Sequence, residues 1–446
     1  MATYKETKMK NSGVEWIGEI PEDWDVTRSK NIFTQRSSRG NDVEEQLAAT
    51  QQHGMYPQKL LEGVVQVKED TDLQQFKTVH KNDYVISLRS FQGGFEMSDY
   101  EGVCSPAYQV FYNTIPISYR YYKYLFKSDG FISKMNSLTV GIREGKNIQY
   151  KDFSNSPIII PPKSTQQRIA SYLDKKCSKI EETIQNQQQV IEKLKAYKQS
   201  LITEAVTGKI KIQNGKVCGK YQSYKESGVE WIGKIPSEWS CVQIKNIFRF
   251  LGGYAFNSED YVDETEYQIL RIGNVKDFKI LFDSSPAYIS KETALKVENF
   301  KLKAGYILFT MTGTRGKKDY FYTHKVTDAD CTKKNIYLNQ RVGCLIPNSN
   351  ISSSYFNYLL KDNLIKDSVF LSETGTANQA NIGSDDVMRI KLHCPPKEEQ
   401  KEIADYLDKK CTAIDTAIEQ KQNLIEKLTE YKKSLIYECV TGKKEI

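Results

Sequence analysis

The motifs of most enzyme sites are missing from this chain of 446 residues. Its four histidines are not spaced with each other or with cysteines as zinc ligands are. Residues 313–318 (GTRGKK) superficially resemble a phosphate-binding loop but lack its glycine spacing and the Ser or Thr after the lysine. The GxSxG turn of serine hydrolases is absent too. We therefore predict that this chain has no catalytic residue, no metal ion and no cofactor of its own.

Paired cysteines and long apolar runs are also lacking. The nine cysteines are single and irregularly spaced, with no CxxC, which is typical of reduced thiols in a cytosol. No apolar stretch approaches the roughly 18 residues that a membrane span needs. The N-terminus lacks the apolar run of a signal peptide. We expect a cytoplasmic protein with no membrane partner.

A strong excess of charge of one sign is not present either. Lys and Arg number 63 and Asp and Glu 56, which leaves a net charge of +7. This permits a polyanionic partner without demanding one, because non-specific nucleic-acid binders are usually far more basic. The 39% hydrophobic content allows packed cores, and the length fits two to four domains.

An internal repeat organises the chain. Residues 10–21 return at 225–236, and the tail block 161–177 returns at 395–411, with a shift of 395 − 161 = 234. The material between the blocks is otherwise dissimilar in the two copies. We predict a duplication and divide the chain into a first globular domain, a first long helix, a linker, a second globular domain and a second long helix, at 1–160, 161–208, 209–224, 225–394 and 395–446.

Both tail blocks carry a heptad stripe, the pattern of a coiled-coil seam. We expect Ser164 to cap the first helix, with Gln167 in the capping-box position. About 40 residues give a helix on the order of 60 Å, and the short basic linker favours an antiparallel pair. The linker is interpreted as a solvated connection with a short hairpin; the alternative is a strip that touches nucleic acid. The predicted seam residues are Ile169, Leu173, Ile180, Ile184, Ile191, Leu194, Leu201, Ile403, Leu407, Ile414, Ile418, Ile425, Leu428 and Leu435.

The two middles have the composition of α+β globules. Runs rich in Tyr, Val, Ile and Phe predict strands, and two tyrosine-rich segments predict matching short helices. Ser-Pro-Ala-Tyr at 105–108 and 285–288 resembles the target-base loop of amino-methyltransferases but lacks its amide or carboxylate, so we interpret both as turns that enter strands. The predicted strands are 84–88, 108–112, 306–310 and 342–346, and the predicted helices are 118–125 and 352–359.

Taken together, these blocks resemble the specificity (S) subunit of type I restriction-modification enzymes. The resemblance rests on the repeated GVEWIGxIPxxW head, the PPxxxQxxIAxYLD tail and the Thr-Gly-Lys ends at 207–209 and 441–443. Segments 311–316 and 374–382 look like the recognition loops of that family. The resemblance implies an α+β fold: two target-recognition domains separated by two long antiparallel coiled-coil helices, as a pseudo-two-fold repeat.

The resemblance also implies partners. Each recognition domain would read one half of a split double-stranded DNA sequence, and the helices would set the gap and dock two modification subunits. Those subunits would use S-adenosylmethionine to methylate adenine at N6. Two restriction subunits, dependent on ATP and Mg, would cut the DNA. Such systems are encoded by bacteria or phages.

Candidate DNA-binding residues follow from the loops. Arg, Lys, Asn and Gln suit base edges and phosphates, and glycine-rich loops let the backbone approach phosphate. The candidates in the first copy are Arg89, Ser90, Gln92, Arg143 and Lys146, and those in the second are Tyr254, Asn274, Thr314, Arg315, Lys317, Lys318, Asn378 and Gln379.

Two other functions fit the same repeats. One is a two-headed DNA-binding regulator that acts without enzymatic partners. The other is a coiled-coil scaffold whose globules bind proteins. A companion methyltransferase, or a bipartite methylation motif that depends on this chain, separates these alternatives from a specificity subunit.

Overall fold

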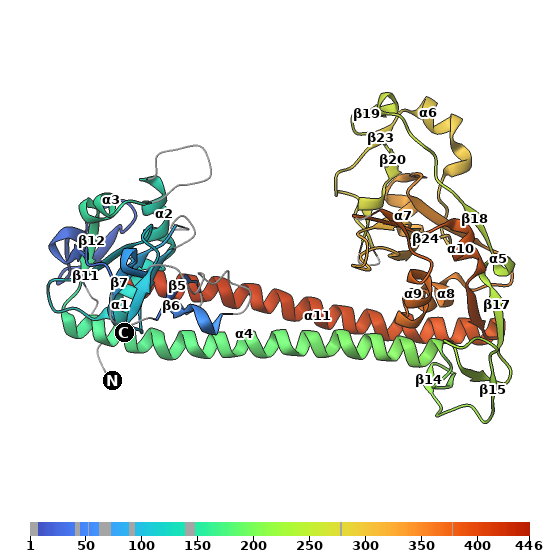
Figure 1. Ribbon diagram of the computed structural model, residues 1–446, viewed down its shortest axis with the longest axis horizontal. Coiled ribbons are helices and arrows are strands. Elements are labelled where there is room, and N and C mark those ends of the chain that lie inside the picture. Colours follow the sequence, from blue (N-terminus) through green and yellow to red (C-terminus); the bar gives the residue numbers. More distant parts are fainter. Residues whose placement is uncertain are drawn as a thin grey trace. The chain divides into compact units, whose positions relative to one another are not determined.

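The computed structural model describes residues 8–40, 45–51, 53–61, 73–88, 94–138, 148–276, 279–376 and 378–446 (Figure 1). The chain divides into two compact units. Unit 1 comprises Met1–Gln189 and Lys421–Ile446, and unit 2 comprises Val190–Gln420. Each unit therefore contains one globule together with the beginning of one long helix and the end of the other.

The two long helices are α4 (Lys163–Val206) and α11 (Lys397–Val440), of 44 residues each. In unit 1, Lys432 Nζ lies 2.5 Å from Glu181 Oε1. In unit 2, Lys198 Nζ lies 2.6 Å from Asp415 Oδ2. Each pair joins a late turn of one helix to an early turn of the other, so the helices run antiparallel, which confirms the predicted pairing. The two ion pairs occupy equivalent repeat positions, since 432 − 198 and 415 − 181 both equal 234.

Burial along the heptad stripe is strongest where the helices meet the globules. Leu173 in unit 1 and Leu407 in unit 2 are fully buried. The buried members of the stripe are Ile169, Leu173, Ile180, Ile191, Leu201, Ile403, Leu407, Ile414 and Leu435. The half-buried members are Ile184, Leu194, Ile418, Ile425 and Leu428. The apolar stripe therefore faces the partner helix or the globule along its whole length.

The expected cap of the first long helix is wrong. Helix α4 begins at Lys163, so Ser164 lies inside its first turn. Buried Gln166 instead closes this end: its Nε2 donates to the Pro161 carbonyl at 2.8 Å, and its Oε1 accepts from the Ser118 amide at 2.8 Å. Gln400 makes the same two bonds in unit 2, to Pro395 and Ser352. A side chain from within the helix therefore satisfies backbone groups that a capping hydroxyl does not reach.

Both globules are built on one sheet design. The antiparallel strand order is β4-β11-β8-β9 in unit 1 and β18-β28-β24-β26 in unit 2. The predicted strands and helices of the middles are confirmed. The strands are β4 (Phe33–Gln35), β8 (Tyr84–Ile86), β9 (Phe95–Met97), β11 (Gln109–Asn113), β18 (Phe248–Leu251), β24 (Ile307–Thr310), β26 (Thr323–Lys325) and β28 (Val342–Pro347).

The helices that follow the sheet also correspond. They are α1 (Tyr119–Phe126), α2 (Asp129–Ser137) and α3 (Tyr150–Asn155) in unit 1 and α8 (Ser353–Leu359), α9 (Asn363–Phe370) and α10 (Ser384–Arg389) in unit 2. The shared flanking strands are β1 (Met9–Asn11), β2 (Glu19–Pro21), β3 (Asp25–Arg28) and β12 (Pro157–Ile160), with β15 (Tyr224–Glu226), β16 (Lys234–Pro236), β17 (Ser240–Gln243) and β31 (Lys391–Cys394). The middles thus share a scaffold that their dissimilar sequences do not reveal.

The units differ in what is inserted between these elements. Unit 1 carries two small sheets, whereas unit 2 carries a four-stranded sheet of order β19-β23-β20-β27 and a three-stranded sheet of order β25-β30-β29. The elements in unit 1 are β5 (Leu47–Thr50), β6 (Gly54–Pro57), β7 (Lys77–Val79) and β10 (Gly102–Cys104). Those in unit 2 are β19 (Tyr261–Val262), β20 (Tyr267–Leu270), β21 (Val275–Lys276), β22 (Lys279–Ile280), β23 (Tyr288–Ile289), α6 (Lys291–Lys296), β25 (Thr312–Gly313), α7 (Asp328–Lys333), β27 (Asn335–Leu338), β29 (Thr374–Thr376) and β30 (Gln379–Asn381). The short helix α5 (Ile244–Ile247) is not inserted, because it stands at the place of residues 29–32 of unit 1.

Each core joins its globule to both long helices. Tyr121 in unit 1 donates its buried hydroxyl to the Val440 carbonyl at 2.8 Å. Tyr355 in unit 2 donates to the Val206 carbonyl at 3.1 Å. These carbonyls belong to the last helical residues of α11 and α4, which have no partner within a helix. The end of each helix is therefore fixed by the globule that stands at the start of the other.

Two further predictions concern connections. The basic linker does form the expected hairpin, of β13 (Ile212–Gln213) and β14 (Lys216–Val217). Both Ser-Pro-Ala-Tyr segments lead into strands, β11 and β23, as expected. Across the part of the chain that the structure describes, every helix is too short or too polar to cross a membrane.

Candidate nucleic-acid interface

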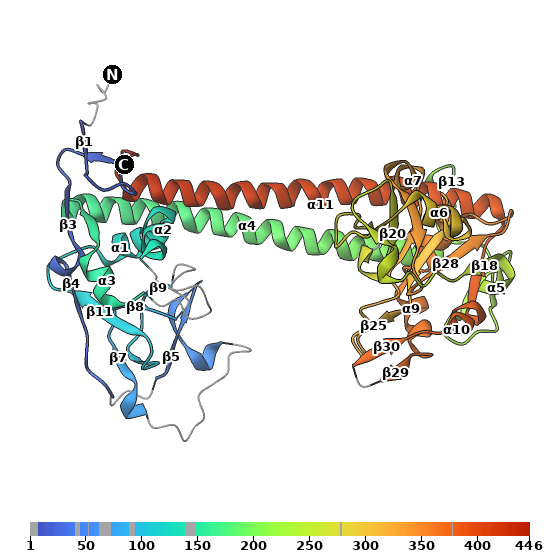
Figure 2. The ribbon, with the colours of Figure 1, turned by 90° about the horizontal axis from the view of Figure 1, so that it is seen from above.

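Four segments of unit 2 meet where β24 ends and β28 begins. The Met311 amide donates to the Arg341 carbonyl at 3.3 Å, and the Ile382 amide donates to the Met311 carbonyl at 3.0 Å. The Gln340 amide donates to the Tyr254 carbonyl at 3.1 Å. Backbone hydrogen bonds thus connect residues 253–254, 311–319, 339–341 and the hairpin of 374–376 and 378–382 into one surface, which we call the edge surface. Figure 2 shows β25, β30 and β29 side by side at one edge of unit 2, away from the long helices in that view.

The three-stranded sheet brings most of the candidate residues of the second copy together. Strand β30 pairs with β25 through Thr312–Asn381 and Gly313–Ala380, and with β29 through Thr376–Gln379. The loop after β25 and the hairpin between β29 and β30 are therefore neighbours. They carry the exposed side chains of Arg315, Lys317, Lys318, Asn378 and Gln379, and the half-buried Thr314.

Carboxylates hold the loop that follows β25. Glu373 accepts hydrogen bonds from the Gly316 amide at 3.3 Å and from the Tyr320 hydroxyl at 3.0 Å. Asp319 accepts from the Thr314 amide at 2.6 Å, and this bond lowers the pKa of the Asp319 carboxyl. The loop is fixed from within, so its exposed basic side chains are presented on a preformed backbone.

The basic side chains of this loop are not equivalent. Lys318 Nζ lies 2.5 Å from Asp367 Oδ1, so its charge already has a partner. Arg315 Nη1 donates to the Gly375 carbonyl at 3.3 Å, which leaves the other guanidinium donors of Arg315 for a ligand. Lys317 is exposed. Arg315 and Lys317 are therefore better placed to meet an anion than Lys318.

Two glycines permit the close backbone approach at this edge. A Cβ atom on Gly253 would lie 2.1 Å from the Asn339 carbonyl carbon. Gly375 has φ +132°, and a Cβ atom there would lie 2.0 Å from the Gln379 oxygen. Neither position accommodates a side chain without moving backbone.

The remaining two candidates of unit 2 have different settings. Tyr254 is 36% exposed, with its ring 4.9 Å from Phe256 and 5.3 Å from Phe300. Asn274 is 1% exposed. Its Oδ1 accepts from the Arg271 amide, and its Nδ2 donates to the carbonyls of Leu281 and Ser284. The Asn274 amide thus shapes a turn and has both of its hydrogens engaged there.

The candidates of the first copy cannot be placed. Arg89, Ser90, Gln92, Arg143 and Lys146 all lie outside the described residues. The sequence analysis missed the turn 339–341 of unit 2, which lies between the Tyr254 segment and the loop after β25. This turn is recognised only in the structure, as the connection between β27 and β28.

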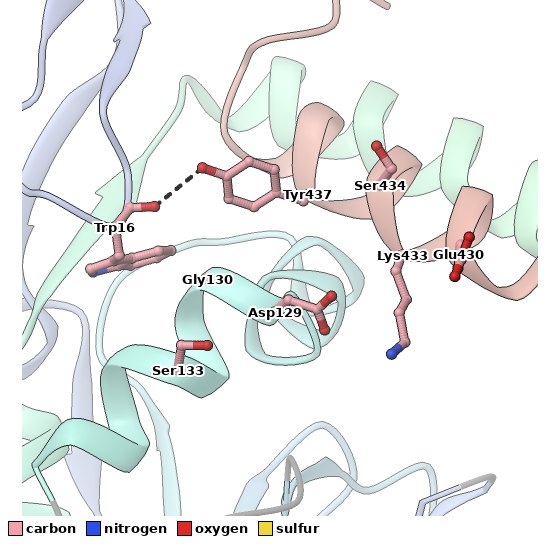
Figure 3. Close-up of a pocket in the computed structure, with 8 residues that line it drawn as sticks. All are labelled: Trp16, Asp129, Gly130, Ser133, Glu430, Lys433, Ser434 and Tyr437. Atoms are coloured by element: carbon pink, nitrogen blue, oxygen red, sulfur yellow. Dashed lines mark hydrogen bonds between the residues drawn. The ribbon is translucent and has the colours of Figure 1, made fainter.

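Unit 1 contains a hollow beside helix α2 (Figure 3). Its volume is about 550 Å³. Tyr437 donates its hydroxyl to the Trp16 carbonyl at 3.3 Å across one wall, and the lack of a side chain at Gly130 lets both rings approach α2. The residue of unit 2 that corresponds to Gly130 at the shift of 234 is Leu364, which is 44% exposed. The lining residues are Trp16, Asp129, Gly130, Ser133, Glu430, Lys433, Ser434 and Tyr437.

Unit 2 has a hollow of about 650 Å³ beside the linker hairpin, lined by Glu204, Lys209, Ile210, Lys220, Tyr224 and Lys234. Among the residues that the structure describes, no group of three or more His, Cys, Asp or Glu side chains is placed to hold a metal ion.

The chain is similar to known specificity subunits. It is 27% identical over 299 residues to the type I restriction enzyme MjaVIII specificity subunit of Methanocaldococcus jannaschii, an alignment that covers 67% of this chain and 64% of that one. It is 24% identical over 483 residues to the putative type I restriction enzyme MjaX specificity subunit of the same organism, over 99% of this chain and 97% of that one. The chain thus spans less than two thirds of the first of these relatives.

A solved structure that concerns complex assembly and conformational transition of the type I R-M system contains a similar fold. The TM-score is 0.68 at 12% identity, over 95% of this chain and 99% of that chain. The family model described as "Type I restriction modification DNA specificity domain" matches residues 21–196 and 236–428. These two stretches make up well over half of the sequence, and the chain therefore belongs to the family of type I restriction modification DNA specificity domains.

Proposed function

We propose that this chain is the DNA-reading subunit of a type I restriction-modification system and that each unit reads one half of a split target. The observation that carries the proposal is the double match of the specificity domain, at 21–196 and 236–428. One match falls on each globule, and both globules share the same sheet order. Two globules that share one sheet design and differ in their inserted loops are suited to a DNA target that consists of two different half-sites.

The edge surface supports DNA as the ligand of unit 2. It presents Arg315, Lys317, Asn378 and Gln379 on a preformed backbone. Arginine and amide side chains are the groups that read guanine and adenine in the major groove, and lysine suits phosphate. The modest net charge of +7 is sufficient if other subunits also contact the duplex.

We further propose that the long helices set the gap between half-sites and dock two modification subunits. Tyr197 on α4 is 53% exposed, and Tyr431 on α11 is 52% exposed. The two positions are repeat-equivalents, because 431 − 197 = 234. An exposed tyrosine on a polar helix is the kind of residue that protein interfaces favour. Equivalent tyrosines on the two helices suit two copies of one partner.

The chemistry then belongs to those partners. In this proposal the modification subunits bring S-adenosylmethionine and methylate adenine at N6, and two restriction subunits supply ATP- and Mg-dependent cleavage. This chain contributes the choice of sequence and the spacing of its two halves.

Methylome sequencing of a host that expresses the chain with its companion modification subunit tests the proposal. We expect a bipartite adenine-methylation motif that disappears when the chain is deleted. Unchanged methylation on deletion would favour a scaffold. Sequence-specific DNA binding by the purified chain without any associated methylation would favour a regulator.

Single variants assign the half-sites. Arg315→Ala is expected to relax or lose one half of the motif and leave the other half intact, because Arg315 lies in the edge surface of unit 2. Arg389→Ala is the matched control: Arg389 is an exposed arginine of the same unit, on α10 beside Gln243, and it lies outside the four segments of the edge surface. A motif unchanged by Arg315→Ala would remove this residue from the reading surface.

A further inference from the structure

The turn between β27 and β28 carries two side chains of unit 2 to which no role has been assigned above. Residues Asn339, Gln340 and Arg341 connect the last residue of β27 to the first residue of β28. We propose that Gln340 and Arg341 read base edges in the half-site bound by unit 2. This inference rests on the proposed function, since it adds specificity-determining residues to the same surface.

The turn is held rigidly at the centre of the edge surface. Its own closing bond runs from the Val342 amide to the Asn339 carbonyl at 3.0 Å. The Gln340 amide is bonded to Tyr254, and the Arg341 carbonyl to Met311, so neighbouring segments hold the turn on both sides. The Cβ-free Gly253 lets the first of these segments lie directly against Asn339. Side chains on such a turn have a fixed origin, which lowers the entropy lost on binding.

The two side chains are exposed. Among the described residues, neither the Gln340 amide nor the Arg341 guanidinium makes a side-chain hydrogen bond or ion pair. Lys318, elsewhere on this surface, is by contrast already paired with Asp367. The full donor set of Arg341 is therefore available to a ligand, as is the donor and acceptor pair of Gln340.

The residue types fit base reading. The guanidinium fork of arginine matches O6 and N7 of guanine, and the amide of glutamine matches N6 and N7 of adenine. A phosphate contact alone does not require glutamine, since it needs only a donor. An adjacent glutamine and arginine therefore favour contact with neighbouring base pairs over contact with the backbone only.

The matching turn in unit 1 lacks both groups. Strand β11 corresponds to β28, and residues 105–108 correspond to 339–342 at the shift of 234. The Tyr108 amide donates to the Ser105 carbonyl at 3.0 Å, as Val342 donates to Asn339. Pro106 and Ala107 occupy the places of Gln340 and Arg341. The turn of unit 1 therefore forms with Ala107 at the position that corresponds to Arg341, so the turn itself is compatible with alanine there.

The test uses the complex of the full chain with its companion modification subunit. Arg341→Ala is expected to weaken binding to cognate DNA by about tenfold to a hundredfold, the usual cost of one bidentate base contact. It is also expected to relax one base pair in the half-site of unit 2, as seen in competition with single-mismatch duplexes and in the methylome. Arg341→Lys should show the same relaxation, because it keeps the charge and loses the fork. Gln340→Ala should relax an adjacent base pair.

Several outcomes would overturn the inference. Arg389→Ala, the control arginine, should leave affinity and motif unchanged; an equal effect there would reduce the result to net charge. If Arg341→Ala weakens cognate and mismatched duplexes equally and Arg341→Lys restores binding, Arg341 contacts phosphate only. Unaltered specificity, or relaxation in the half-site of unit 1, would also refute the assignment. A wild-type complex that produces no bipartite motif would instead refute the proposed function. Co-purification with the modification subunit and an unchanged melting temperature show that each variant is folded.

Discussion

Units 1 and 2 share a set of internal contacts and differ most where the chain leaves the sheet. Gln166 and Gln400 make equivalent bonds at the helix starts, and Tyr121 and Tyr355 bind equivalent helix-end carbonyls. The strand order of the central sheet is also shared. The differences lie in the segments that connect these elements. Residues that close the core are thus retained after duplication, while the strand ends are free to take different side chains.

The cores themselves differ at a few matched positions. Buried His393 in unit 2 stands where unit 1 has Ile159. Both ring nitrogens of His393 are buried and have no hydrogen-bond partner among the described residues. Unit 1 instead contains buried Glu96, which forms an ion pair with the half-buried Lys127. Buried Glu96 in unit 1 and buried His393 in unit 2 are thus titratable groups of opposite charge type.

The largest expected effect comes from the matched leucines of the helices. Leu173→Ala and Leu407→Ala should each lower the free energy of unfolding of their own unit by about 3 kcal/mol, because both side chains are fully buried. Hydrogen exchange resolved by unit measures the two losses. Equal losses would show that the two units depend equally on their helices; a loss spread over both units would contradict their independence.

Acidification should move the stabilities of the two units in opposite directions. Burial raises the pKa of Glu96 from its usual 4.5 to about 7, against the opposing effect of Lys127. Folded unit 1 thus binds more protons than the unfolded chain between these values and gains stability as pH falls. Burial lowers the pKa of His393 from 6.5 to about 4, so unit 2 loses stability between pH 6.5 and 4. From pH 7 to pH 5 we expect about 2 kcal/mol in each direction.

Hydrogen exchange at pH 7 and pH 5, corrected for the intrinsic rates, measures this divergence. Glu96→Gln should remove the response of unit 1 only. His393→Ile, which copies the residue of unit 1, should remove the response of unit 2 only. Parallel responses of the two wild-type units would show that other groups dominate.

A smaller effect is expected from the matched tyrosine hydroxyls. Tyr121→Phe and Tyr355→Phe each leave a helix-end carbonyl without its buried donor, which costs about 1 kcal/mol. The loss should appear in the melting of the unit that holds the variant, together with faster exchange in the last turn of α11 for Tyr121→Phe and of α4 for Tyr355→Phe. An unchanged last turn would mean that packing alone fixes the helix end.

Periodic and repeated features of this fold were predictable from the sequence. The heptad stripes, their antiparallel pairing and the short strands all follow from local spacing and composition. The common sheet was not predictable, because the residues of β8 and β24 share only apolar character and the segments between the strands differ in length. The cap was mispredicted because Gln166 acts through Ser118, a contact that no local rule contains.

The candidate site was predictable only in part, because local composition marks some of its segments and contacts between distant segments define the others. Arg315 and Gln379 lie in segments whose composition already indicates a binding role, and the structure brings these segments together. Asn274 also carries a side-chain amide, but both hydrogens of this amide are donated to carbonyls of its own turn. Arg341 belongs to a two-strand connection with no distinctive composition, and its position beside Met311 appears only when β24 and β28 are paired.

The contact of Tyr121 with Val440 has a consequence for synthesis. The core of unit 1 includes Leu435, Ile436, Cys439 and Val440, which the ribosome adds among the last residues of this sequence. Unit 2 ends at Gln420 and can close earlier, although N-terminal domains commonly fold first during translation. Unit 1 must wait with its apolar surface uncovered while the whole of unit 2 is made. A prematurely terminated chain would keep that apolar surface exposed. Quality-control proteases would then recognise the truncated chain by this surface and degrade it.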